Sequence, residues 1–425
     1  MAGIQLGYET QREPGFGFPD GHIPSKQNTP IFFDGDGPIC LIAPTGAGKG
    51  RDFLIPTILS YDGPLLVTDL KGELASVCAR RRREMGYEVA VLDPFKITQI
   101  GSARLNPFDL FNLPGAMLES EAEMMASQLG EEHLIEKDRF WNDQANSLIA
   151  GLIVAIQTTE EPIDRDFVTL KDYLFADDVV YNLATLLDNK GKAMPKFAYG
   201  AIAAFLQAAD QNTRPSILST AQNYMRALCS EAVELCLKDS TIKLADVIEG
   251  KPLDIFICIP PEKIKSHKSL VRFWVGTLLT AIMRRTEIPA KQTLLVADEA
   301  AQLGEFDLVL TACTLLRGYG LRLITAWQDV AQIRSRYKAD YATILNNAEA
   351  LISFGQSHYG AAKEYADLFG IDTAELMKMG MDRAALSIRG EGTRVIQRLN
   401  YLKDERFAGL ADPNPYFARH QGRVR

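Results

Sequence analysis

The sequence lacks long apolar runs. The two longest, residues 148–156 and 270–283, fall short of the roughly 18–20 uncharged residues that a membrane-spanning helix needs, and Arg272 interrupts the second. No signal peptide is recognisable in the first residues. Both runs are typical of core helices, and we expect a soluble chain.

Cysteine and histidine are scarce and scattered. None of the six cysteines forms a Cys-x-x-Cys pair and none of the five histidines lies in a cluster, so the sequence predicts no zinc site. Dispersed cysteines favour a reduced, cytosolic setting.

Basic residues are not in excess. The formal net charge of −8 excludes nucleic-acid binding through overall positive charge, so any basic track has to be local. The basic run at residues 80–83 lies on a predicted helix and is either a solvated face or a contact to DNA or phosphate.

The overall composition is that of a globular protein, because 47% of the 425 residues are hydrophobic and 24% are charged. A chain of this length is expected to form about two or three domains.

The most informative stretch is residues 39–60. An apolar strand at 39–43 breaks into a Pro/Gly turn, and a helix is predicted at 51–60. The backbone N–H groups of such a turn and the positive end of the helix dipole point at an anion. Glycines let the backbone curl around a phosphate, and a lysine reaches the β- and γ-phosphates. The predicted phosphate-binding residues are Thr45, Gly46, Ala47, Gly48, Lys49 and Gly50.

This stretch departs from the P-loop pattern G-x-x-x-x-G-K-[ST] at both ends. Ala43 replaces the first glycine, which a strand end tolerates, and Gly50 stands where a hydroxyl normally binds Mg²⁺. The alternative is an ordinary strand–turn–helix whose glycines only make the turn. A second strand that carries carboxylates would favour the phosphate site.

Strands alternate with helices on both sides of a long helical segment. Such alternation predicts a parallel sheet whose ligand edge lies at the carboxyl ends of the strands. Ala43, Asp69 and Asp93 fall on that edge. The predicted strands cover residues 39–43, 65–68, 88–93, 253–259, 293–297, 321–328 and 350–354.

Helical patterning dominates the middle of the chain, with a loop at 191–195. Helices are predicted at 122–129, 140–156, 179–187, 199–209 and 216–238. The spacing in the second of these predicts burial of Ala145, Leu148, Ile149, Leu152 and Ile153.

These patterns predict three parts of the chain. Residues 1–30 are an arm or linker without regular structure, residues 31–107 together with 216–425 form a nucleotide-binding α/β domain, and residues 108–215 form an all-α domain inserted into it.

The strand at 293–297 is followed directly by Asp298 and Glu299. A P-loop enzyme needs such a strand, because one acid holds Mg²⁺ and the other polarises the attacking water. We predict that Asp298 is the metal ligand and Glu299 the catalytic acid. The alternative is a strand end with solvated acids. Since the P-loop and the acidic strand occur in one alternating α/β pattern, nucleotide hydrolysis is favoured.

Two later residues fit catalytic roles. Arg317 follows the helix after the acidic strand and can serve as an arginine finger that reaches a neighbouring subunit; the alternative is a surface arginine. Gln328 ends the next strand at the ligand edge, where its amide can sense the γ-phosphate. Trp327 beside it is expected in the core.

Several motifs, in this order, resemble the TraG/TraD-type coupling-protein ATPases of type IV secretion and bacterial conjugation, in which a glycine after the P-loop lysine is familiar. They are APTGAGKG at 43–50, LIPT at 54–57, TDLKGE at 68–73, LDPF at 92–95, FW at 140–141, VADE at 296–299, DERF at 404–407 and DPNPY at 412–416.

The resemblance implies a RecA-like P-loop NTPase domain with an inserted all-α domain, and ATP with Mg²⁺ as cofactors. It implies a homo-hexameric ATPase at the cytoplasmic face of the bacterial inner membrane. Its partners would be a relaxase–DNA complex, secreted effector proteins, and the ATPases and inner-membrane components of the secretion channel. By position, Lys49, Asp298, Glu299, Arg317 and Gln328 match the family's functional residues. Such proteins usually begin with transmembrane helices, which this chain does not show, so it is either a soluble fragment or a natural member without the anchor.

Another class of function stays open. A receptor scaffold that binds nucleotide with little turnover also fits Gly50 and the acidic net charge. A general DNA pump outside secretion is a third hypothesis, which the motif at 404–416 disfavours.

Overall fold

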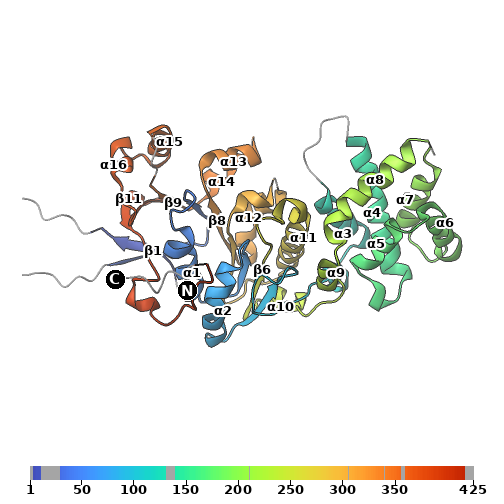
Figure 1. Ribbon diagram of the computed structural model, residues 1–425, viewed down its shortest axis with the longest axis horizontal. Coiled ribbons are helices and arrows are strands. Elements are labelled where there is room, and N and C mark those ends of the chain that lie inside the picture. The colour runs from blue at the N-terminus through green and yellow to red at the C-terminus, as the bar shows by residue number, and fades with distance from the viewer. Residues whose placement is uncertain are drawn as a thin grey trace, which may run out of the picture. The chain divides into compact units, whose positions relative to one another are not determined.

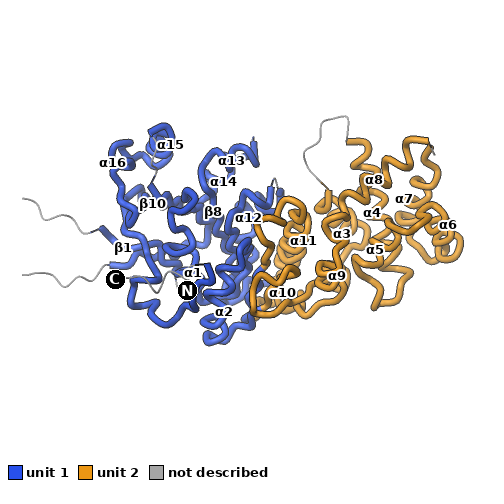
Figure 2. Tube along the Cα trace, viewed as in Figure 1, with its two compact units in different colours: residues 1–89, 252–256, 287–425 blue, residues 90–251, 257–286 orange. Residues whose placement is uncertain are grey.

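The computed structural model describes residues 3–10, 29–130, 139–209, 211–304, 306–338, 340–355 and 359–416. The chain divides into two compact units, shown in blue and orange in Figure 2. The first comprises residues 1–89, 252–256 and 287–425, and the second comprises residues 90–251 and 257–286.

One sheet of 11 strands is ordered β2-β1-β11-β10-β9-β3-β8-β7-β4-β6-β5. Figure 1 labels β1, β11, β9, β8 and β6 of this sheet. Strands β9, β3, β8, β7 and β4 pair in parallel, whereas β2, β1, β11, β10 and β9 pair antiparallel. The parallel strands β3, β4, β7 and β8 are buried along their whole length, as strands covered on both faces are. Their bounds are β3 (Ile39–Ile42), β4 (Leu65–Thr68), β5 (Glu88–Leu92), β6 (Leu253–Ile257), β7 (Thr293–Ala297), β8 (Leu321–Trp327) and β9 (Ala350–Phe354).

All seven predicted strands are present at these positions, but the sheet continues beyond them. The additional strands are β1 (Ile4–Glu9), β2 (Pro30–Phe33), β10 (Arg383–Ile388) and β11 (Gly392–Gln397). The expectation of an arm without regular structure is wrong for Ile4–Glu9, because this segment pairs with β11 and β2; residues 11–28 of that arm lie outside the described residues.

The helices of the first unit are short. They are α1 (Ile55–Ser60), α2 (Glu73–Glu84), α12 (Asp307–Thr314), α13 (Val330–Tyr337), α14 (Tyr341–Asn347), α15 (Tyr359–Phe369) and α16 (Thr373–Lys378). Trp327, at the end of β8, is fully buried against the edge of the Tyr337 ring, which confirms its expected place in the core.

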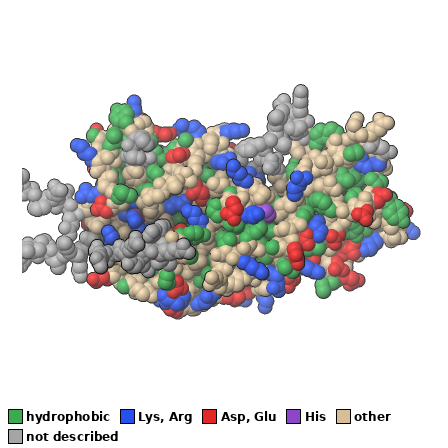
Figure 3. Space-filling model, viewed as in Figure 1, with side chains coloured by type: hydrophobic (Ala, Val, Ile, Leu, Met, Phe, Trp, Pro, Cys, Tyr) green, Lys and Arg blue, Asp and Glu red, His purple; other side chains and the backbone are tan. Residues whose placement is uncertain are grey.

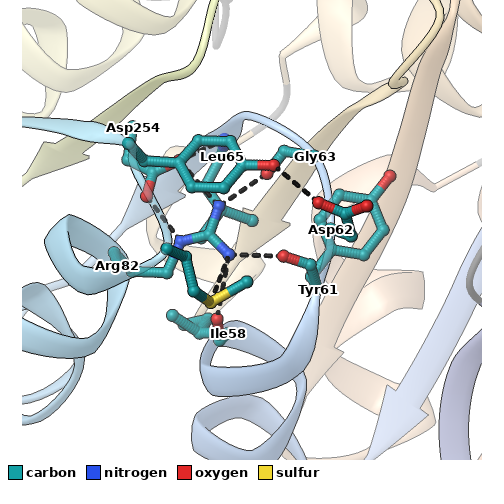
Figure 4. A network of polar contacts seen from close by, with 9 residues as sticks. Ile58, Tyr61, Asp62, Gly63, Leu65, Arg82 and Asp254 are labelled. Carbon is teal, nitrogen blue, oxygen red and sulfur yellow. Dashed lines mark hydrogen bonds and ion pairs between the residues drawn. The ribbon is translucent and has the colours of Figure 1, made fainter.

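Helix α2 carries the basic run at 80–83, and its interpretation as one solvated face is wrong for Arg82, which is buried. Arg82 is 0% exposed and is paired with Asp254, also 0% exposed, at 2.6 Å. Its other nitrogens donate to the carbonyl oxygens of Tyr61 and Gly63 (Figure 4). Arg80 forms ion pairs with Glu84 and Asp412 at the surface. On the face shown in Figure 3, basic side chains are interspersed with acidic ones.

The second unit contains the predicted helical segment. Its helices are α3 (Leu118–Leu129), α4 (Arg139–Thr159), α5 (Phe167–Leu174), α6 (Val179–Lys190), α7 (Lys196–Gln207), α8 (Thr213–Met225), α9 (Glu231–Leu237), α10 (Leu244–Glu249) and α11 (Ile264–Met283). The expected single helix at 216–238 is wrong, because the chain turns at Arg226–Leu228 and Ser230 takes an extended conformation before α9. The expected insertion, residues 108–215, lies inside this larger unit.

Helix α4 is the centre of the second unit and packs on α3, α7 and α8. Its five predicted core residues are all buried. A Cβ on Gly151 would lie 2.5 Å from the Ala201 Cβ, so glycine is required for α4 and α7 to approach this closely. In the part of the chain that the structure describes, no helix combines the length and apolar character that a bilayer crossing demands.

Candidate nucleotide-binding site

The loop after β3 has the backbone geometry that a phosphate cradle needs. The Ala47 N–H donates to the Pro44 carbonyl, which closes a turn. Gly46 and Gly48 have φ values of +79° and +92°, in the left-handed region that side chains disfavour. A Cβ on Gly48 would also lie 2.9 Å from the Asp52 carboxylate. Both glycines are therefore required by the conformation of the loop.

The helix that follows the loop begins irregularly. Gly50–Leu54 forms a single π-helical turn before α1, and the Ile55 N–H donates to the Gly50 carbonyl five residues earlier. Pro56 explains this turn: it has no N–H to donate to the Asp52 carbonyl, and its ring would crowd that oxygen in a regular α-helix. The loop and helix together place the Lys49 side chain at the carboxyl edge of the sheet.

Lys49 joins the P-loop to the acidic strand. Its Nζ donates to Glu299 Oε2 at 2.5 Å and lies 3.0 Å from Asp298 Oδ1. Burial lowers the pKa of Lys49, but the two carboxylates raise it more, so the net pKa lies above its ordinary value and the amine is charged. Asp298 Oδ1 is buried, and the Lys49 amine is the partner of this carboxylate oxygen.

Gln328 completes the cluster. Its Nε2 donates to Glu299 Oε1 at 2.5 Å, so both oxygens of this carboxylate have partners. The parallel register explains the convergence: Ile42 of β3 lies opposite Trp327 of β8, and β8 pairs in turn with β7, so the three strands end at one edge. The cluster predicted from the ends of three separate strands is thus brought together in one unit.

Glu299 has a strained backbone. Its φ and ψ are +58° and +54°, a left-handed conformation that costs a residue with a side chain roughly 1 kcal/mol or more. Strain of this kind persists where the surroundings determine the conformation, and it directs the carboxylate back toward Lys49 and Gln328.

These residues fit a nucleotide phosphate with Mg²⁺. Two left-handed glycines shape the loop, a charged amine stands beside it, and a buried carboxylate oxygen of Asp298 is paired, within the described part of the chain, with this amine alone. Oxygen ligands and few protein contacts are what Mg²⁺ prefers in phosphate sites. Among the described residues no group of three or more His, Cys, Asp or Glu could hold a metal by itself.

Arg317 is not part of this cluster. It lies in the turn Leu316–Tyr319 directly before β8, whereas Gln328 follows β8, so a strand of 7 residues, about 20 Å, separates them. Its side chain is 61% exposed and Nη1 lies 3.4 Å from Asp36 Oδ1. Arg317 therefore stands at the sheet edge opposite to the phosphate loop of its own chain.

Sequence reasoning missed Arg398 and Asp52. Arg398 Nη1 donates to the Ala47 carbonyl at 2.7 Å and lies 3.3 Å from Asp52 Oδ2, and both side chains are buried. Its guanidinium also lies 4.2 Å from the centre of the Phe354 ring. The Gly-rich turn between β10 and β11 signals a hairpin, but nothing local indicates that the end of that hairpin reaches the P-loop.

Residues 21–398 match the protein family described as type IV secretory system conjugative DNA transfer. The conjugal transfer protein TraG of Escherichia coli is 23% identical over 351 residues, which are 78% of this chain and 54% of TraG. The type IV secretion system-coupling protein VirD4 of Bartonella henselae is 24% identical over 383 residues, which are 87% of this chain and 56% of VirD4. The chain spans about half the length of these curated relatives.

The fold is similar to that of the bacterial conjugative coupling protein TrwBΔN70, with a TM-score of 0.68, 15% identity, and coverage of 87% of this chain and 86% of that one. TrwB in complex with the ATP analogue ADPNP gives a TM-score of 0.67 at 16% identity, over 85% and 84% of the two chains. The expected fold class, a RecA-like P-loop NTPase with an all-α domain, is confirmed. Because the family match covers most of the sequence, the chain belongs to the type IV secretory system conjugative DNA transfer family.

Proposed function

We propose that this chain is an ATP-hydrolysing coupling protein, which recruits DNA or protein substrates and drives them into a type IV secretion system. The observation that carries the proposal is the meeting of Lys49 with Asp298 and Glu299 at the carboxyl edge of the parallel sheet. TrwB, which shares the fold, has been seen with ADP and Mg²⁺ and with an ATP analogue.

Each residue of the cluster has a role in this proposal. The amides of residues 45–50 and the Lys49 amine hold the phosphates of ATP, and Asp298 holds Mg²⁺. When bound, Mg²⁺ neutralises charge on the phosphate oxygens. Glu299 orients the attacking water, and Gln328, which holds the Glu299 carboxylate by a hydrogen bond, senses the γ-phosphate. The left-handed backbone of Glu299 keeps its carboxylate in this position.

Arg317 serves the neighbouring subunit. It stands at the edge opposite to its own P-loop and is exposed, so its guanidinium can reach a site only on another copy of the chain. There it stabilises the charge that develops on the phosphate oxygens during transfer. Hydrolysis then depends on assembly, and a homo-hexameric ring is the assembly we propose.

The proposed partners follow from family membership. They are a relaxase–DNA complex, secreted effector proteins, and the ATPases and inner-membrane components of the secretion channel, with the protein at the cytoplasmic side of the bacterial inner membrane. The helical segment at 108–215 is the proposed place of substrate recognition.

The test is ATP hydrolysis as a function of protein concentration, with and without single-stranded DNA. We expect a rate that rises more steeply than protein concentration, is stimulated by DNA, and is abolished by Glu299→Gln. The Glu364→Gln variant, in an exposed pair with Arg334, is the control and should keep the rate. A negligible rate together with tight nucleotide and substrate binding would instead establish the receptor scaffold.

A further inference from the structure

Gly50 stands where a P-loop usually has the hydroxyl of Ser or Thr, and the carboxylate of Glu73 is a candidate to replace that hydroxyl. An ideal Cβ on Gly50 would have one neighbour within 4 Å outside its own segment, and this neighbour is Glu73 Oε1, at 3.8 Å. The space next to the place of the usual Ser or Thr hydroxyl is therefore filled by a carboxylate oxygen. We propose that Glu73 takes over the role of that hydroxyl and supplies an oxygen to the Mg²⁺ of the bound nucleotide, directly or through one of its waters.

Glycine at position 50 is not required by the backbone. Gly50 has no positive φ, unlike Gly46 and Gly48, and a Cβ at 3.8 Å from Glu73 is in ordinary van der Waals contact. A serine is sterically acceptable here. Neither backbone conformation nor lack of space therefore accounts for the missing hydroxyl. An oxygen ligand supplied by another element would make that hydroxyl unnecessary.

Glu73 follows the strand that lies beside the acidic strand. It is the first residue of α2, and it follows β4, whose last residue, Thr68, lies opposite Ala297 of β7. The Glu73 N–H donates to Asp69 Oδ1 at 3.1 Å, and the charges of Asp298 and Glu73 both raise the pKa of Asp69. Two carboxylates from neighbouring strand ends therefore face the same region, which suits an ion that takes few protein ligands.

The C-terminal DPNPY motif holds Glu73 in place. Buried Asn414 donates to Glu73 Oε1 at 2.6 Å, and the Tyr416 hydroxyl donates to the Lys71 carbonyl at 2.6 Å. Upstream, the Asp412 N–H donates to the Val77 carbonyl. Asn414 is thus a positioning residue that fixes the direction of the carboxylate, as partners of metal ligands do. This gives a role to a motif that the nucleotide site itself does not use.

The inference rests on the proposed nucleotide site, and its test measures metal dependence rather than turnover. The binding of a fluorescent ATP analogue is titrated with Mg²⁺, beginning in EDTA. For Glu73→Gln we expect unchanged affinity in EDTA and an increase of about tenfold or more in the Mg²⁺ concentration that gives half of the metal-dependent tightening. The affinity of the protein–nucleotide complex for Mn²⁺, measured by electron paramagnetic resonance, should fall in parallel. Glu84→Gln, on the exposed end of the same helix, should match the wild type.

Rescue makes the test specific. Gly50→Ser restores the hydroxyl, and the double variant Glu73→Gln/Gly50→Ser should return to the Mg²⁺ dependence of the wild type. Glu73→Gln with the same Mg²⁺ dependence as Glu84→Gln would overturn the inference, as would a failure of Gly50→Ser to rescue. A wild-type chain that binds no nucleotide under any condition would overturn the proposed function itself, so the two failures are distinguishable. Thermal melting of each variant verifies the fold.

Discussion

Arg398 donates a hydrogen bond to the carbonyl oxygen of Ala47, and in this way the end of an antiparallel strand holds the middle of the phosphate loop. The same guanidinium pairs with buried Asp52, which follows the loop. Burial lowers the pKa of Arg398, and the neighbouring Asp52 carboxylate opposes this effect.

Arg398→Ala should therefore destabilise both the fold and the site. It leaves Asp52 buried with Arg51 as its remaining ion-pair partner, and we expect a loss of about 3 kcal/mol in the free energy of unfolding. Nucleotide affinity should fall as well, because Ala47 loses its anchor. Urea unfolding and nucleotide titration measure the two effects. Arg394→Ala, in an exposed pair with Glu391, should cost less than about 1 kcal/mol; equal losses in both variants would refute the anchor.

The buried pair of Arg82 and Asp254 should be intolerant of single changes. Arg82→Met leaves a buried carboxylate and several carbonyl oxygens without their donor, and we expect a loss of about 3–5 kcal/mol. Burial already raises the pKa of Asp254 and Arg82 opposes this, so the loss should grow as the pH rises and Asp254 must ionise. Denaturant unfolding between pH 5 and pH 8 measures it. Arg83→Met, exposed on the same helix, should change stability by no more than about 0.5 kcal/mol.

The raised pKa of buried Asp69 predicts that the free energy of unfolding decreases as the pH rises toward neutral. Burial, followed by the charge of Asp298, raises its pKa to about 7 in the folded chain, although hydrogen bonds from the Ala75 and Lys71 backbone N–H groups oppose the shift. The unfolded chain releases this proton near its ordinary value of 3.8, so between these two pH values only the folded chain binds it. The contribution of Asp69 to stability is therefore fully present below its unfolded pKa of 3.8 and is lost as the pH rises through its folded pKa of about 7. Asp69→Asn should remove this part of the slope in unfolding free energy against pH, and an unchanged slope would contradict the raised pKa.

Arg317 should act in trans. Arg317→Ala should reduce hydrolysis by about 10³-fold, the effect typical of an arginine finger, without changing the melting temperature, because the side chain is exposed. Mixing it with Lys49→Ala, which retains Arg317 but lacks the phosphate lysine, should recover part of the activity at their shared interfaces. Arg334→Ala, another exposed arginine, is the control. Two inactive variants whose mixture stays inactive would refute the trans contact.

Local patterns were enough to predict much of the fold. Apolar runs with polar residues at their ends predicted β3, β4, β7, β8 and β9, and alternation with helices predicted their parallel pairing. Once strands are parallel, their carboxyl ends share one edge, so the meeting of Lys49, Asp298 and Gln328 was predictable without knowing any contact. Among the antiparallel strands that were missed, β11 is largely half-buried or exposed, and its alternation is too weak to stand out.

The sequence by itself determined the class of the fold, the phosphate loop and the acidic strand, because each depends on the order of residues within one short segment. Only the tertiary structure decided that Arg82 is buried, that Arg398 holds the P-loop, and that Glu73 lies beside Gly50. These relationships join segments that lie far apart along the chain, and their geometry follows from how the sheet and α2 pack, which no local pattern encodes.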